Sequence, residues 1–107
     1  MEYEGIELQE LIGSEKQVKW ANDLRIKFLE SIKTLDDDTL PCYANDYTSC
    51  VKSLEVVSKR YGEISEVKKI VMETLAKKGS SKYWIDNRLN NPIYLFFLTL
   101  VEISKIN

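Results

Sequence analysis

Two short stretches of the sequence gather side chains suited to binding another molecule: lysine, arginine, asparagine and tryptophan. They are Lys16, Lys19 and Trp20 in the first stretch, and Trp84, Asn87 and Arg88 in the second. An arginine can hold a carboxylate or a phosphate through two parallel hydrogen bonds, and tryptophan and arginine dominate the energetics of protein–protein contacts. These six residues are the candidate binding residues, either for a protein surface or for a nucleotide or nucleic acid whose base stacks on an aromatic ring.

Each of these side chains also has a structural interpretation. The two tryptophans could pack at a contact between helices, with Trp20 at the edge of the core because it lies off the apolar face of its helix. Arg88 could pair with a carboxylate of the first helix. The lysines, with Arg25 beside them, could form a solvated face that Glu15 and Asp23 partly neutralise, or a face that weakly tracks phosphates. The sequence leaves these interpretations open.

The composition offers little for catalysis. The chain has no histidine, which is the commonest general base near neutral pH and the commonest metal ligand. Its two cysteines, Cys42 and Cys50, do not complete a four-ligand zinc site of the usual kind, and its four glycines are isolated, so there is no glycine-rich phosphate loop. The carboxylates at 36–38 could hold magnesium but are more typical of a solvated turn. We expect a protein that is not an enzyme and uses no metal or cofactor.

Length and charge indicate one folded domain. The chain has 107 residues, of which 44% are hydrophobic and 30% charged, enough for a single core. Its net charge of −2, from 15 basic and 17 acidic residues, is too balanced to indicate a nucleic-acid protein. The first residues are acidic and unlike a secretory signal, so we expect a cytoplasmic protein. The longest apolar run, 93–101, has about half the ~20 residues of a membrane span, so no membrane association is expected.

The first helix has the clearest start signal. Ser14 and Gln17 have the spacing of a capping box, in which each side chain bonds the backbone N–H of the other residue. Gly13 provides the turn before it, and residues 1–12 are expected to form an extended or irregular N-terminal arm. The apolar side chains recur at helical spacing. They are Val18, Ala21, Leu24 or Arg25, Phe28 and Ile32.

Four further helices are predicted from caps and apolar spacing. They span about 46–60, 65–78, 80–90 and 92–106. Their predicted caps are, in order, Asp46 or Thr48, Ser65, Ser80 or Ser81, and Asn91. Pro92 suits the first position of the last helix, which is apolar on nearly every side and therefore expected to be buried; a strand is the competing interpretation. The predicted fold is all-α, a compact single-domain bundle of about five helices with an apolar buried C-terminal helix.

Two motifs resemble a known group of proteins. Residues 11–21 read LIGSEKQVKWA and residues 84–88 read WIDNR. Together they resemble a loosely defined family of small, mostly uncharacterised proteins carried by bacteriophages and other mobile elements of low-GC bacteria. The resemblance covers the first third of the chain and the later motif, and the region 36–61 matches nothing in it. No activity attaches to these motifs, but the family context implies a host-directed or element-maintenance role.

These observations favour a non-enzymatic binding protein. The expected partner is a host protein or ribonucleoprotein complex in the bacterial cytoplasm, and the expected role is inhibition of a bacterial defence system, such as that of an anti-CRISPR protein acting on a CRISPR effector. The alternative is an accessory protein that binds a nucleotide or nucleic acid. The apolar last helix is also compatible with a homodimer.

Overall fold

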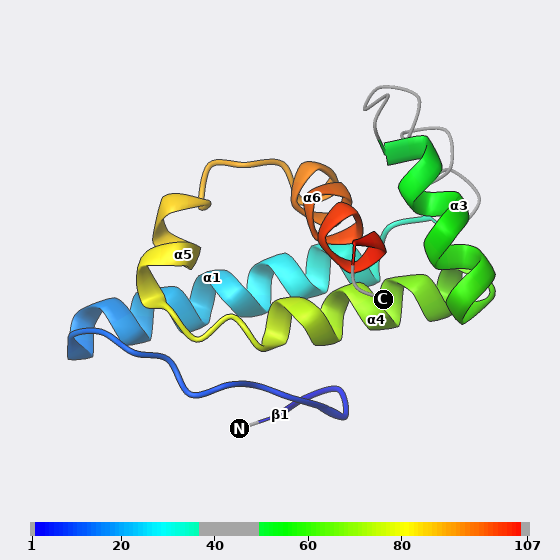
Figure 1. The fold of residues 1–107 in the computed structure, drawn as a ribbon. Coiled ribbons are helices and arrows are strands. Elements are labelled where there is room, and N and C mark those ends of the chain that lie inside the picture. The colour runs from blue at the N-terminus through cyan, green and yellow to red at the C-terminus, as the bar shows by residue number, and fades with distance from the viewer. Residues whose placement is uncertain (1, 37–49, 106–107) are drawn as a thin grey trace.

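The computed structural model describes residues 2–36 and 50–105, with the side chains of 50–53 left aside. This part of the chain holds a short hairpin and five helices (Figure 1). The strands are β1 (Glu2–Tyr3) and β2 (Ile6–Glu7), and the helices are α1 (Glu15–Lys33), α3 (Cys50–Tyr61), α4 (Ile64–Ala76), α5 (Ser81–Asp86) and α6 (Pro92–Ser104). The predicted all-α bundle is confirmed, and its last element is a helix. Outside the described residues lie Cys42, the carboxylates at 37–38 and the predicted caps Asp46 and Thr48.

The capping box at the start of α1 is present as predicted. The Gln17 backbone N–H donates to Ser14 Oγ at 3.3 Å, and the Ser14 N–H donates to Gln17 Oε1 at 3.0 Å. Gly13 has a positive φ of 155°. A Cβ at this glycine would lie 3.0 Å from Ser81 Oγ and 3.1 Å from Gln17 Oε1. Position 13 therefore has room only for glycine, because α5 packs closely against the start of α1.

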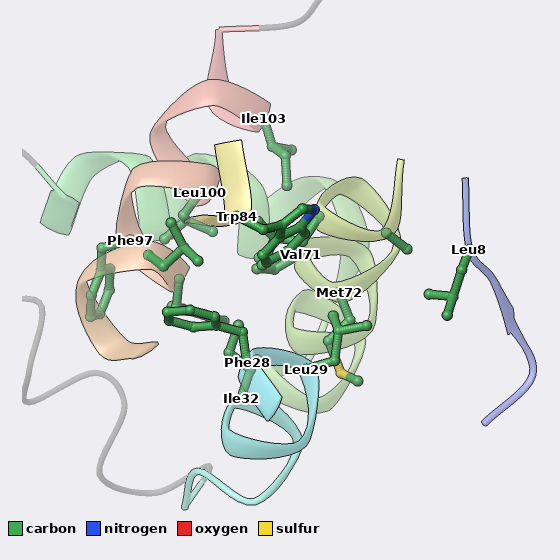
Figure 2. Close-up of a cluster of buried hydrophobic side chains, with 14 of the residues drawn as sticks. Leu8, Phe28, Leu29, Ile32, Val71, Met72, Trp84, Phe97, Leu100 and Ile103 are labelled. Carbon is green, nitrogen blue, oxygen red and sulfur yellow. The ribbon is translucent and has the colours of Figure 1, made fainter. Parts of the chain in front are cut away.

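The core is shared by all the helices and the N-terminal arm. Helices α1 and α4 lie alongside each other, α6 crosses them, and α5 covers the first half of α1 (Figure 1). Figure 2 shows α1, α4 and α6 directing side chains toward one centre, with Trp84 of α5 and Leu8 of the arm joining the same cluster. The burial of these apolar groups is the main driving force for the fold.

Helix α6 is largely buried, as expected. Phe96 and Phe97 are buried with their rings edge to face at 5.2 Å, but Tyr94 and Leu98 are exposed on the outer side, so the helix is not covered all round. Asn91 accepts a hydrogen bond from the Ile93 N–H at 2.9 Å and caps the helix. Across residues 2–36 and 50–105, no helix combines the length and apolarity that crossing a membrane requires.

Two predicted helix boundaries are wrong. Helix α4 begins at Ile64 with Glu63 as its N-cap, so Ser65 lies in the first turn instead of capping it. Helix α5 ends at Asp86 rather than near Asn90, and residues 87–90 form turns. At this end of α5 the Tyr83 carbonyl accepts both the Asn87 backbone N–H at 3.1 Å and the Asn87 side-chain amide at 2.7 Å.

The N-terminal arm is more regular than predicted. β1 and β2 pair antiparallel, with Tyr3 opposite Ile6, and the following residues are hydrogen bonded to the helices. The Gln9 N–H donates to the Ala76 carbonyl at 2.9 Å, and the Ile12 N–H donates to the Gly79 carbonyl at 2.8 Å. The arm is thereby fixed along the end of α4, where it buries Leu8 and Leu11.

Candidate functional site

The two sequence motifs meet where α5 packs on α1. Trp84 is fully buried at this contact. Its indole N–H donates to the Lys78 carbonyl at 3.0 Å, and its ring lies 6.0 Å from that of Phe28 and 5.2 Å from that of Tyr83. The proposal of Trp84 as a binding residue is corrected, because a ring without exposed surface cannot touch a partner. Its role is to join α5 to α1.

Trp20 and Arg88 form a pair on the surface of the same contact. The Trp20 side chain is 47% exposed, and Arg88 Cζ lies 5.4 Å from the centre of the indole ring. Arg88 Nη1 also donates to the Ile85 carbonyl at 2.7 Å. Arg88 thus does pack on the first helix, but on an aromatic ring and not on the carboxylate that the sequence suggested. Such a cation–π contact contributes about 0.5–1 kcal/mol at an exposed site.

Asn87 has a local structural role. Its Nδ2 donates to the Tyr83 carbonyl, and its Oδ1 accepts from Asn90 Nδ2, each at 2.7 Å. These bonds shape the turn that carries Arg88 to the Trp20 ring. Asn87 therefore positions a contact residue, and its own amide is already used within the protein.

The two lysines of the first motif differ in their direction around α1. At about 100° of rotation per residue, Lys16 stands about 40° from Trp20, and Lys19 stands about 100° from Trp20 in the same direction around the helix. Lys19 accordingly lines a separate cavity beside the N-terminal arm. Lys16 is thus the closer of the two to Trp20 around the helix, whereas Lys19 faces a separate cavity.

A small hollow of about 190 Å³ adjoins this surface and was missed by the sequence analysis. Its walls come from α1, from the turn after α5 and from the first residue of α6. They are Leu24, Lys27, Phe28, Ser31, Arg88, Asn90 and Pro92. The spacing from Trp20 through Leu24 and Lys27 follows one helix face, which is the signal that could have identified it.

We call Trp20, Leu24, Lys27, Arg88 and Pro92 the Trp20 face. The face combines a flat apolar ring, an arginine held against that ring, and a hollow lined by apolar groups and two cations. No carboxylate is among the residues that line the hollow. Such a surface binds by burying apolar area and by attracting negative charge.

Metal binding has less support in the described structure. Among residues 2–36 and 50–105, no three Cys, Asp or Glu side chains gather where they could hold a metal ion. The magnesium site considered at 36–38 lies mostly outside these residues. No protein-family model, curated protein or solved structure matches the chain.

Proposed function

We propose that this protein is a non-enzymatic binding protein that docks on an acidic protein surface through the Trp20 face. The observation that carries the proposal is the half-exposed Trp20 ring, which Arg88 holds beside a cationic, apolar-lined hollow. A ring fixed in place before binding loses little conformational freedom on association. Trp20 is therefore suited to anchor the contact, with the hollow receiving an apolar side chain of the partner.

The size of the hollow and the charge of the chain favour a protein partner over a nucleotide or nucleic acid. The hollow, of about 190 Å³, is smaller than the roughly 300 Å³ at which typical small-molecule pockets begin. The net charge of −2 opposes general attraction to phosphate backbones. Lys16, Lys27 and Arg88 supply positive charge only locally, and Asp23 stands one turn before Lys27.

The resemblance of the two motifs supports a narrower proposal. Proteins of phages and mobile elements act on the host cell, so the proposed partner is a bacterial defence complex, such as a CRISPR effector ribonucleoprotein, and the proposed effect is inhibition. Within the two motifs, Gly13, Ser14, Gln17 and Trp84 have structural roles. Trp20 and Arg88 remain as the exposed motif residues that form one surface.

The proposal is tested by comparing surface variants in binding and inhibition. Tagged wild-type protein, Trp20→Ala and Arg88→Ala are used to capture partners from a low-GC bacterial lysate with and without nuclease, and each is added to a purified CRISPR effector cleavage assay. Leu98→Ala is the matched control, because Leu98 is similarly exposed, at 45%, but lies on α6. We expect a nuclease-resistant partner that both Trp20-face variants lose and the control retains.

Two outcomes would contradict the proposal. If Trp20→Ala and Leu98→Ala reduce the capture of the partner equally, the Trp20 face is not the contact surface. Loss of all partners after nuclease, with binding that falls steeply as salt rises, would instead support the nucleotide- or nucleic-acid-binding alternative.

A further inference from the structure

A second cavity lies between α1 and the N-terminal arm, on the side of α1 away from the Trp20 face. Its volume is about 430 Å³, within the range of small-molecule sites. Its walls are formed by the arm and by one side of the first half of α1. They are Leu8, Gln9, Glu10, Leu11, Val18, Lys19, Asn22 and Arg25. The cavity shares no residue with the Trp20 face.

Arg25 is set in the wall of this cavity as a buried cation. Its side chain is only 2% exposed. Nη1 donates to the Gln9 carbonyl at 2.6 Å, and Nη2 donates to Asn22 Oδ1 at 2.9 Å. Both acceptors are uncharged and belong to residues that line the cavity. Nε is buried, and no hydrogen-bond acceptor reaches it from the described residues.

Within the described residues, no carboxylate balances the charge of Arg25. Burial lowers the pKa of its guanidinium, and no acidic group of this part of the chain opposes that shift. An arginine stays charged in proteins, and a buried charge without a counter-charge is strongly unfavourable. An anionic group near Arg25 would therefore be stabilised by this site.

The other lining residues indicate which anion fits. Lys19 adds a second positive charge and Glu10 a negative one, so the lining carries one net positive charge. This balance suits a singly charged carboxylate better than a doubly charged phosphate. Leu8, Leu11 and Val18 add apolar wall, which suits a hydrocarbon body attached to that carboxylate.

We propose that this cavity binds a small apolar carboxylic acid. The carboxylate lies between Lys19 and Arg25, and the hydrocarbon body lies against Leu8 and Leu11. The same chemistry is offered by a free fatty or amino-acid-derived acid and by the C-terminal carboxylate of a peptide that ends in an apolar residue. The site is independent of the Trp20 face. A negative result in its test would therefore leave the proposal for the Trp20 face unaffected.

The test is an NMR titration of the full-length, ¹⁵N-labelled protein. Sodium hexanoate is compared with hexanamide, which has the same carbon chain without the charge. We expect hexanoate to shift the Arg25 Nε–H signal and the backbone amides of Gln9 and Asn22 saturably, with a dissociation constant on the order of 1 mM. Hexanamide should bind about 10-fold more weakly, because a hydrogen bond to a charged group is worth more than one to a neutral group. Equal shifts with both probes, or no saturable shift, would overturn the proposal.

Further probes distinguish the source of the carboxylate. A peptide with an N-terminal acetyl group and a C-terminal leucine is compared with the same peptide as its C-terminal amide. Binding of hexanoate but not of the peptide acid assigns the cavity to free acids, and tighter binding of the peptide acid assigns it to chain ends. Tighter binding of inorganic phosphate than of either carboxylate would refute the assignment to carboxylates.

Two lysine variants keep the test decisive. Lys19→Ala should weaken hexanoate binding about 2- to 5-fold, the range expected for a partly solvated charge pair. Lys16→Ala, one turn earlier and outside the cavity, should leave binding unchanged. Arg25→Leu should abolish binding. If Arg25→Leu does not fold, the two lysine variants still test the proposal. Equal weakening of hexanoate binding by Lys19→Ala and Lys16→Ala would indicate general charge attraction and contradict a defined site.

Discussion

Replacing each tryptophan separately by alanine should produce very different losses of stability. Trp84 is fully buried between α5 and α1, and its indole N–H is bonded to the Lys78 carbonyl. Trp20 is half exposed and contacts Arg88 through its ring face. The two residues have the same chemistry, so their variants compare a core position with a surface position directly.

The magnitudes follow from burial. Trp84→Ala should lower the free energy of unfolding by about 3–5 kcal/mol through the lost ring and the space left behind. The Lys78 carbonyl, left without its donor, adds about 1–3 kcal/mol to this loss. Trp20→Ala removes a cation–π contact of about 0.5–1 kcal/mol and part of a half-exposed surface, so its loss should be about 1–2 kcal/mol. For a domain of this size, each kcal/mol lowers the melting temperature by about 4 °C.

Thermal unfolding followed by circular dichroism measures both losses. We expect a melting temperature about 16 °C or more lower for Trp84→Ala, and about 4–8 °C lower for Trp20→Ala. Trp84→Phe keeps most of the apolar ring but not the N–H donor, and should fall between these values. If Trp84→Ala lowers the melting temperature no more than Trp20→Ala, the assignment of Trp84 to the core is wrong.

Two other predictions concern the junction with α5 and the effect of pH. Gly13→Ala should lower the free energy of unfolding by about 1–3 kcal/mol more than Gly62→Ala, because both glycines have positive φ but only the Cβ at Gly13 meets neighbouring atoms; equal losses in denaturant titrations would contradict the close contact with Ser81. Burial and the nearby Glu102 carboxylate raise the pKa of Tyr83 to about 12. The unfolded chain loses this proton near pH 10, so stability should fall as pH rises from about 10 to 12, and Tyr83→Phe should reduce that fall; an identical pH profile for the variant would refute the link.

Much of the fold follows from local signals. The capping box of α1, the asparagine cap and first-turn proline of α6, and the alternation of turns and apolar spacing were all readable along the chain, because caps and helical periodicity depend on residues a few positions apart. The end of α5 was not predicted correctly, since residue type alone does not show whether the chain continues as a helix or turns after Asp86. In the structure residues 87–90 turn beside α1, with the Asn87 side chain bonded to the Tyr83 carbonyl.

The candidate site was predicted only in part. Lys16, Trp20 and Arg88 lie on or beside one surface, but Trp84 is buried, Asn87 shapes a turn, and Lys19 faces a different cavity. Residue type alone does not separate these cases, because tryptophan serves equally well as a core residue and as a surface anchor.

The sequence by itself determined an all-α chain, the approximate positions of its helices and a supply of residues suited to binding. The tertiary structure decided which of those residues reach the surface together, because that depends on contacts between segments far apart in the chain. The approach of α5 to α1 buries Trp84 and stacks Arg88 on Trp20. The arm, which is fixed along the end of α4, brings the Gln9 carbonyl to the buried guanidinium of Arg25 on α1. Helical spacing fixes the direction of each side chain from its own helix, whereas the neighbour it meets is fixed only by packing.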